Sequence, residues 1–193
     1  MMTTDDLETY LNLLVQDLTS RGMKRALLLC DSWSSNKNQK LWIGLQKKYE
    51  SQIVLEKLII PEGTTGLVQP LDVFYFRQFK SFVRRVSDSL DLVDKIWQRD
   101  KYFALQAFVH FQFGAPQFRD MIKYSFYASR YLDQRPNRFE TPAEVCFKFS
   151  KLERCSSTGC SKYADICCAH CSSYLCYQHC ILESLHINCN KQN

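Results

Sequence analysis

The chain has 193 residues, of which 46% are hydrophobic and 13% aromatic, and its formal net charge is +5. This length allows one sizeable domain with a small module, and the apolar content excludes a largely disordered chain. No apolar run has transmembrane length and the start lacks a signal-peptide pattern, so we expect no membrane as a partner.

Residues 5–19 are predicted to form an amphipathic helix. Apolar side chains recur there at helical spacing and give one apolar face, and Thr4 or Asp5 is suited to cap the start. We expect a scaffold helix that packs on a sheet.

Two apolar segments are predicted to form a pair of parallel strands. Residues 26–30 are apolar on both faces, as expected of a central strand covered by helices on each side. Residues 53–60 also favour a strand, with an interruption at 56–57. A helical pattern over 38–49 separates the two, and strand–helix–strand is the unit that produces a parallel pair.

Three acidic residues follow these segments and are candidates for binding a divalent cation. Asp31 comes directly after the first strand, although an acid there also commonly starts the turn into a following helix. Glu62 follows the second strand. Asp72 lies just after Pro70 in the first turn of a predicted helix, where backbone N–H groups stabilise a carboxylate; a first-turn acid is also common without any further role. Acids presented at one edge of a sheet are how an α/β scaffold builds a Mg²⁺ site.

The predicted helix over residues 71–90 has an aromatic face and a basic face. Its basic residues are Arg77, Lys80, Arg84 and Arg85. Such a stripe can neutralise DNA phosphates, although a solvated face is the commoner explanation for basic residues at this spacing. The whole charge excess of the chain lies before residue 155, and beside the two candidate acids the DNA-binding interpretation becomes about as well supported as the solvated face.

Further helices are predicted over residues 92–113 and 116–132, separated by a Gly-Ala-Pro break. Their many Phe and Tyr residues recur at helical spacing, so we expect them to pack in a core. Thr141, Pro142 and Glu144 match a helix start, with a cap, a proline at the first position and an acid in the first turn.

The last part of the chain, residues 151–193, is rich in cysteine and histidine. Its predicted metal ligands are Cys155, Cys160, Cys168, Cys171, Cys176, His179, His186 and Cys189. Pairs of Cys or His at two-residue separation turn both side chains toward one cation, and four soft ligands suit tetrahedral Zn²⁺. We therefore predict two structural zinc ions, without which so short a segment would not fold. The alternative is a disulfide cluster, which a secreted protein would favour.

The spacing of these ligands resembles a cross-brace module of the B-box or AN1 type. The resemblance implies that Cys155, Cys160, Cys176 and His179 hold one metal and that Cys168, Cys171, His186 and Cys189 hold the other. Cys167, His170 and Cys180 are spare and could substitute for their neighbours. Cysteine-rich tails also occur in some transposases.

The first part of the chain also carries a family resemblance. Residues 27–32 (LLLCDS), 59–65 (IIPEGTT) and 69–72 (QPLD), with Lys80 beyond them, resemble the last two-thirds of a DDE-superfamily transposase catalytic domain. The nearest match is the pogo/Tigger/jerky branch of the mariner superfamily, and the similarity covers residues 7–150.

This resemblance implies an RNase H-like fold in which three acids hold two Mg²⁺ ions and DNA strands are cut and joined. It makes Asp31 the second acid and Asp72 the third, with Glu62 as the alternative to Asp72. Family members usually carry His a few residues past the second acid, where this chain has Asn36. No further strand is predicted upstream of residues 26–30 to supply the first acid. We therefore expect a truncated RNase H-like (DDE) domain of α/β class, with a helical extension, over residues 1–150.

These observations predict a DDE transposase-derived DNA-binding or endonuclease domain that acts on DNA in the nucleus. Two carboxylates are a poor cage for two Mg²⁺ ions, so we expect weak or absent nuclease activity. One alternative is a non-enzymatic nuclear DNA- or protein-binding protein domesticated from a transposase. Another is a protein-interaction adaptor of the ubiquitin pathway built on the zinc module. Self-association and the binding of a nuclear protein also stay open.

Overall fold

The computed structural model describes residues 3–89, 99–150, 152–182, 186 and 189. The chain divides into an N-terminal unit, residues 1–69, and a C-terminal unit, residues 70–193. Within the described residues, no helix is long and apolar enough to cross a membrane.

The first helix, α1 (Thr4–Ser20), begins one residue earlier than its apolar pattern indicated. Thr3 is its cap: the Thr3 Oγ1 accepts from the Asp6 N–H at 3.2 Å, and the Asp6 Oδ2 accepts from the Thr3 N–H at 2.9 Å. This reciprocal pair is a capping box, so the expectation that Thr4 or Asp5 caps the helix is wrong. The predicted apolar face is buried through Leu7, Leu11 and Val15.

The predicted parallel strand pair is confirmed. Strand β1 (Arg25–Cys30) pairs with β2 (Val54–Ile59) in a register that runs from Arg25↔Val54 to Cys30↔Ile59. The connection contains a short helix α2 (Ser34–Lys37) and the predicted helix α3 (Gln39–Tyr49). The interruption expected at 56–57 is wrong, because β2 is continuous through both residues: Glu56 pairs with Arg25 at 2.8 Å across the two strands.

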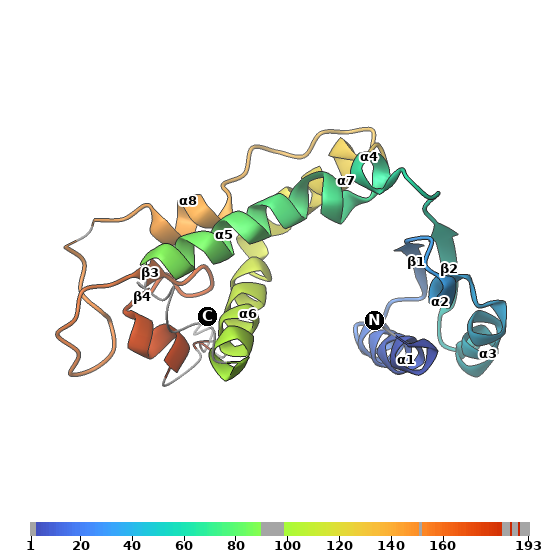
Figure 1. The fold of residues 1–193 in the computed structure, drawn as a ribbon, viewed down its shortest axis with the longest axis horizontal. Coiled ribbons are helices and arrows are strands. Elements are labelled where there is room, and N and C mark those ends of the chain that lie inside the picture. The colour runs from blue at the N-terminus through green and yellow to red at the C-terminus, as the bar shows by residue number, and fades with distance from the viewer. Residues whose placement is uncertain (1–2, 90–98, 151, 183–185, 187–188, 190–193) are drawn as a thin grey trace. The chain divides into compact units, whose positions relative to one another are not determined.

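One face of this sheet is covered and the other is exposed. Ala26, Leu28 and Leu55 pack on a core formed with α1 and α3. On the opposite face Leu27 is 56% exposed and Val54 48% exposed. The expectation that β1 is covered on both faces is therefore wrong for the described chain, because α1 and α3 contribute to the same core (Figure 1). Two strands and their helices show an α/β unit, and the RNase H-like fold remains a prediction.

A short helix α4 (Thr65–Val68) ends the N-terminal unit, and the C-terminal unit begins with a π-helical turn, η1 (Leu71–Tyr75). This turn runs directly into α5 (Phe76–Ser89), so the helix predicted over 71–90 is present through Ser89. The next helix, α6 (Arg99–Phe113), lies within the segment predicted at 92–113, whose first residues, 92–98, fall outside the described residues.

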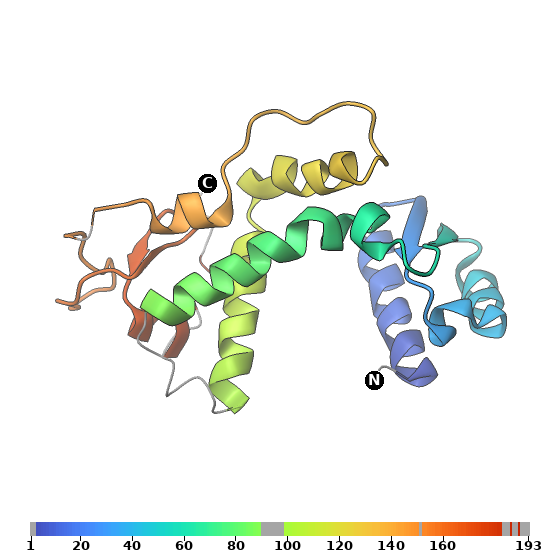
Figure 2. The same cartoon turned by 45° about the horizontal axis from the view of Figure 1, so that its top comes forward.

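The remaining helices are short. A 3₁₀ turn η2 (Pro116–Phe118) leads into α7 (Arg119–Ala128), which stops before the predicted end because Arg130 adopts a left-handed φ of 66°. Helix α8 (Pro142–Phe147) has the predicted cap: Thr141 and Glu144 form a capping box. Within the unit, α7 lies beside the η1 end of α5 and α8 beside its other end (Figures 1 and 2).

The cysteine-rich segment shares one core with these helices. Its strands β3 (Ile166–Cys167) and β4 (Tyr174–Leu175) are antiparallel, and a π-helical turn η3 (Gln178–Leu182) follows. Ile166, Leu175 and Ile181 are buried in the same cluster as the aromatic residues of α5 and α6. The domain boundary at residue 150 stays a prediction, while the packing makes this segment part of the C-terminal unit.

Candidate metal centres and nucleic-acid interface

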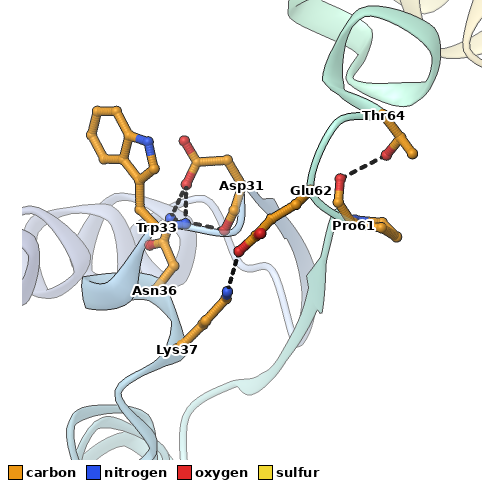
Figure 3. A network of polar contacts seen from close by, with 7 residues as sticks. All are labelled: Asp31, Trp33, Asn36, Lys37, Pro61, Glu62 and Thr64. Carbon is orange, nitrogen blue, oxygen red and sulfur yellow. Dashed lines mark hydrogen bonds and ion pairs between the residues drawn. The ribbon is translucent and has the colours of Figure 1, made fainter.

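Asp31 lies directly after β1, at the carboxyl end of the parallel pair. Its Oδ1 accepts from the Trp33 backbone N–H at 3.2 Å and from the Asn36 Nδ2 at 2.6 Å (Figure 3). The first bond closes a turn from an acid to the N–H two residues on, and it is Trp33 that stands at the cap position of α2. Asp31 is therefore a turn residue whose carboxylate orientation is fixed by Asn36.

Asn36 is buried and joins this edge of the sheet to the core. Its backbone carbonyl accepts from the Trp42 Nε1 at 2.9 Å and from the Lys57 Nζ at 2.9 Å. The Lys57 ammonium also lies 4.8 Å from the centre of the Trp42 ring, and burial lowers the pKa of Lys57. Sequence reasoning noted Asn36 only as a departure from the family and missed Lys57. The position of Lys57 within an otherwise apolar predicted strand was the only sequence feature that could have indicated its role.

Glu62 follows β2 at the same edge as Asp31 and faces Lys37 (Figure 3). The Lys37 Nζ lies 2.8 Å from the Glu62 Oε1, and this hydrogen bond lowers the pKa of Glu62. Both side chains are largely exposed, so the ion pair is screened by water. To act as the alternative third acid, Glu62 would have to break its ion pair with Lys37 and bind a metal ion instead.

Asp72 lies in the π-helical turn η1 and is exposed. It belongs to the C-terminal unit, whereas Asp31 and Glu62 belong to the N-terminal unit. That Asp31 and Asp72 share a cation stays a prediction.

The four basic residues predicted to bind DNA are all exposed on α5. At about 100° per residue, Arg77, Lys80 and Arg84 fall within an arc of about 60°, and Arg85 lies about 100° from Arg84. The Arg85 guanidinium stacks 5.1 Å from the Phe147 ring centre. Among the described residues, none of the four forms an ion pair.

The first cysteine–histidine quartet consists of Cys155, Cys160, Cys176 and His179. The Cys160 and Cys176 sulfurs are 3.8 Å apart, and the His179 Nδ1 lies 3.4 Å from the Cys155 sulfur and 3.2 Å from that of Cys176. Burial opposes ionisation of Cys155, but hydrogen bonds from backbone N–H groups lower its pKa to about 6. Burial raises the pKa of Cys176 to about 11.

The second quartet consists of Cys168, Cys171, His186 and Cys189. The Cys168 and Cys189 sulfurs are 3.9 Å apart, and the His186 Nε2 lies 3.2 Å from the Cys171 sulfur. Burial and the neighbouring thiols raise the pKa of Cys189 to about 12.

Both quartets fit a tetrahedral metal ion. In each, the ligand atoms all lie within 4.8 Å of one another. Two thiolates bound to one Zn²⁺ at about 2.3 Å lie about 3.8 Å apart, which is the sulfur separation found here. The two groups have the composition implied by the cross-brace resemblance, and the three spare residues Cys167, His170 and Cys180 lie outside both. The identity of the ion remains a prediction.

Residues of α6 and of the turn after it contact the loop of the second quartet without being ligands themselves. The Gln112 Oε1 accepts from the Ala169 N–H at 2.6 Å, and the Gln112 Nε2 lies 3.5 Å from the Cys168 sulfur. The Gln117 Nε2 donates to the Ala169 carbonyl at 2.6 Å. His170 stacks on Phe111 with ring centres 4.0 Å apart. Sequence reasoning missed these contacts, because nothing local marks a glutamine as the partner of a loop more than fifty residues away.

Two protein families match the chain. A family described as DDE superfamily endonuclease matches residues 1–115, which include Asp31, Asp72 and the basic residues of α5. A family described as Tc5 transposase C-terminal domain matches residues 126–189, which include all eight cysteine and histidine ligands. No curated protein and no solved structure matches the chain.

Proposed function

The chain belongs to the DDE superfamily endonucleases, and from this premise we propose that it is a transposase-derived protein that binds DNA through α5. The observation that carries this proposal is the basic face of α5, which begins one turn after Asp72 and forms no ion pair with a described residue. Phosphates that replace counterions on such a face give salt-dependent affinity. A protein acting on chromosomal DNA would work in the nucleus.

Asp31 and Asp72 are proposed as the Mg²⁺ ligands, with Glu62 in reserve. Mg²⁺ ions bound by acids at such a site stabilise the attacking and leaving oxygens of a phosphodiester. The contribution of this chain is to hold the carboxylates: Asn36 orients Asp31 by a 2.6 Å hydrogen bond. With two acids only, cleavage is expected to be weak or absent.

The two cysteine–histidine quartets are proposed to bind structural Zn²⁺. Their ligand sets leave no open position for a substrate, as in other structural sites with four protein ligands. Their task would be to fold the segment that packs on α5, α6 and α8.

DNA binding is tested with a fluorescent duplex and the zinc-loaded chain. The double variant Lys80→Ala/Arg84→Ala should weaken binding and reduce the slope of log affinity against log salt by about 2, close to 0.9 per lost phosphate contact. The matched control Lys40→Ala/Lys47→Ala removes two exposed charges from α3 and should bind like the unchanged chain. Equal losses in both variants would contradict the assignment to α5.

Catalysis is tested separately by nicking of supercoiled plasmid with Mg²⁺. Nicking that disappears in Asp31→Ala and in Asp72→Ala would identify an active endonuclease. Binding without nicking, unchanged in Asp31→Ala, would select the second candidate, a non-enzymatic DNA-binding protein. That candidate is favoured because the Asp31 Oδ1 accepts two hydrogen bonds and Glu62 pairs with Lys37, and these contacts compete with metal binding.

A further inference from the structure

The C-terminal unit contains a groove that lies between α5 and α6. Its volume is about 590 Å³, within the roughly 300–1,000 Å³ of small-molecule sites. It is lined by Asp72, Phe76, Phe79, Lys80, Val83, Arg84, Tyr102 and Gln106. Neither phosphate binding along α5 nor metal binding by the two quartets requires a groove.

The groove has a fixed apolar base and exposed aromatic sides. Phe79 is half-buried and held by neighbouring rings, with centres 4.8 Å from His110 and 5.4 Å from Phe113. Phe76 on α5 is 37% exposed and Tyr102 on α6 is 49% exposed. Large aromatic surfaces left open beside a groove are favourable places for a flat ring to bind.

The polar groups of the groove suit a nucleotide. Gln106 lies one helical turn after Tyr102, and its amide offers a donor and an acceptor to the edge of a base. Lys80 and Arg84, one turn apart, line the same groove, and neither forms an ion pair with a described residue. Two cations against the single acid Asp72 leave the groove positive, which complements a phosphate.

We propose that this groove binds an unstacked nucleobase of single-stranded DNA, with the adjoining phosphate at Lys80 and Arg84. The proposal rests on DNA being the partner of this chain. Tyr102 and Phe76 supply the stacking surface, because every base presents a π face to an aromatic ring whatever its sequence. Gln106 contacts the edge of the base, and Asp72 then lies next to the sugar–phosphate backbone of that nucleotide.

The test measures binding of three labelled DNA probes to the zinc-loaded chain. The first probe is a single strand of about 20 nucleotides, the second is the same strand with abasic sites in place of its bases, and the third is a duplex. Tyr102→Ala should weaken binding of the first probe about tenfold and leave binding of the abasic strand unchanged. The control is Phe103→Ala, an exposed aromatic residue of α6 outside the groove lining, and it should bind all three probes like the unchanged chain.

The outcomes separate this inference from the proposed function. If the duplex still depends on Lys80 and Arg84 but Tyr102→Ala binds every probe normally, the groove inference is overturned and the proposed function stands. If no probe binds, both are overturned. If Tyr102→Ala instead abolishes self-association measured by sedimentation, the groove holds a second copy of the chain and the nucleobase inference is overturned. A circular dichroism spectrum and a zinc content equal to those of the unchanged chain show that each variant is folded.

Discussion

The Gln112 Oε1 accepts a 2.6 Å hydrogen bond from the backbone N–H of Ala169, which lies in the metal-binding loop 168–171 between the predicted ligands Cys168 and Cys171. Gln112 is completely buried, and its Nε2 lies 3.5 Å from the Cys168 sulfur. One side chain therefore fixes both the backbone and a ligand atom of the second quartet. Metal binding by the second quartet should consequently stabilise α6, and the packing of α6 should in turn strengthen metal binding.

Replacing Gln112 by leucine should destabilise the zinc-loaded chain by about 1–3 kcal/mol, because the Ala169 N–H would be buried without an acceptor. Urea unfolding measures this loss, and transfer of zinc to a coloured chelator should be faster for the variant. The control is Gln106→Leu, a half-buried glutamine on the same helix that lines the groove between α5 and α6. Identical unfolding of Gln112→Leu and the unchanged chain would refute the role of Gln112.

Two metal ions per chain are expected, one in each quartet. Cys155→Ser and Cys189→Ser should each reduce the zinc content measured by mass spectrometry from two to one, since a quartet with three soft ligands binds more weakly. Cys146→Ser and Cys167→Ser change cysteines outside both quartets and should retain two ions. Removal of both ions by a chelator should unfold the C-terminal unit, because its short strands and several ligand cysteines belong to the same hydrophobic core as α5 and α6. Two ions in Cys155→Ser would mean that the grouping of ligands is wrong.

Thr3→Ala should destabilise the N-terminal unit by about 1 kcal/mol, the usual loss for a helix cap. Thr4→Ala is the control and should have a smaller effect, because Thr3 and not Thr4 accepts the cap hydrogen bond. Urea unfolding followed by Trp42 fluorescence, with the other two tryptophans replaced by phenylalanine, measures both.

The contribution of Asp6 to the same cap should depend on pH. Hydrogen bonds from the backbone and side chain of Thr3 hold the pKa of Asp6 below its usual 3.8. A carboxyl group whose pKa is lowered by folding adds stability above its unfolded pKa and loses it as pH falls through the folded pKa. Asp6→Asn should therefore unfold at a lower urea concentration than the unchanged chain at pH 7, and the difference should shrink below pH 3.8. A difference that is constant with pH would contradict this account.

Asn36 and Asp31 should be energetically coupled. Asn36→Ala removes a hydrogen bond to a charged acceptor and should cost about 1.5–3 kcal/mol, but much less once Asp31 is already alanine. A double-mutant cycle of unfolding free energies measures the coupling. Asn38 supplies the matched control, because its side chain caps α3 through the Leu41 N–H and should add independently to Asp31→Ala. Strict additivity for Asn36 and Asp31 would show that the 2.6 Å contact contributes no stability.

Local patterns in the sequence predicted most of the secondary structure. The parallel direction of β1 and β2 follows from the strand–helix–strand order. The cap of α8 follows from Thr141 and Glu144, which lie three residues apart. Metal binding was indicated by pairs of ligands separated by two residues, whereas the division into two quartets came from the cross-brace resemblance.

Contacts between distant segments were not predictable in the same way. The exposure of Leu27 depends on which face of the sheet the helices cover, and a strand that is apolar at every position does not indicate which face that is. Gln112 has its partner fifty-seven residues away, so a glutamine in an aromatic helix gives no local sign of its role. Asn36 and Lys57 are likewise connected only through the folded edge of the sheet.

The π-helical turn at Leu71–Tyr75 sets the rotational phase between Asp72 and the cations that follow it. In an uninterrupted α-helix, Asp72 would point about 80° away from Lys80 and about 120° away from Arg84. A π turn accommodates one extra residue, which reduces both angles to about 20° and brings the carboxylate onto the same side as the two cations. A single inserted residue is thus enough to convert an acid on the flank of a helix into a member of a mixed-charge row, and deleting one residue between 73 and 75 would turn it away again.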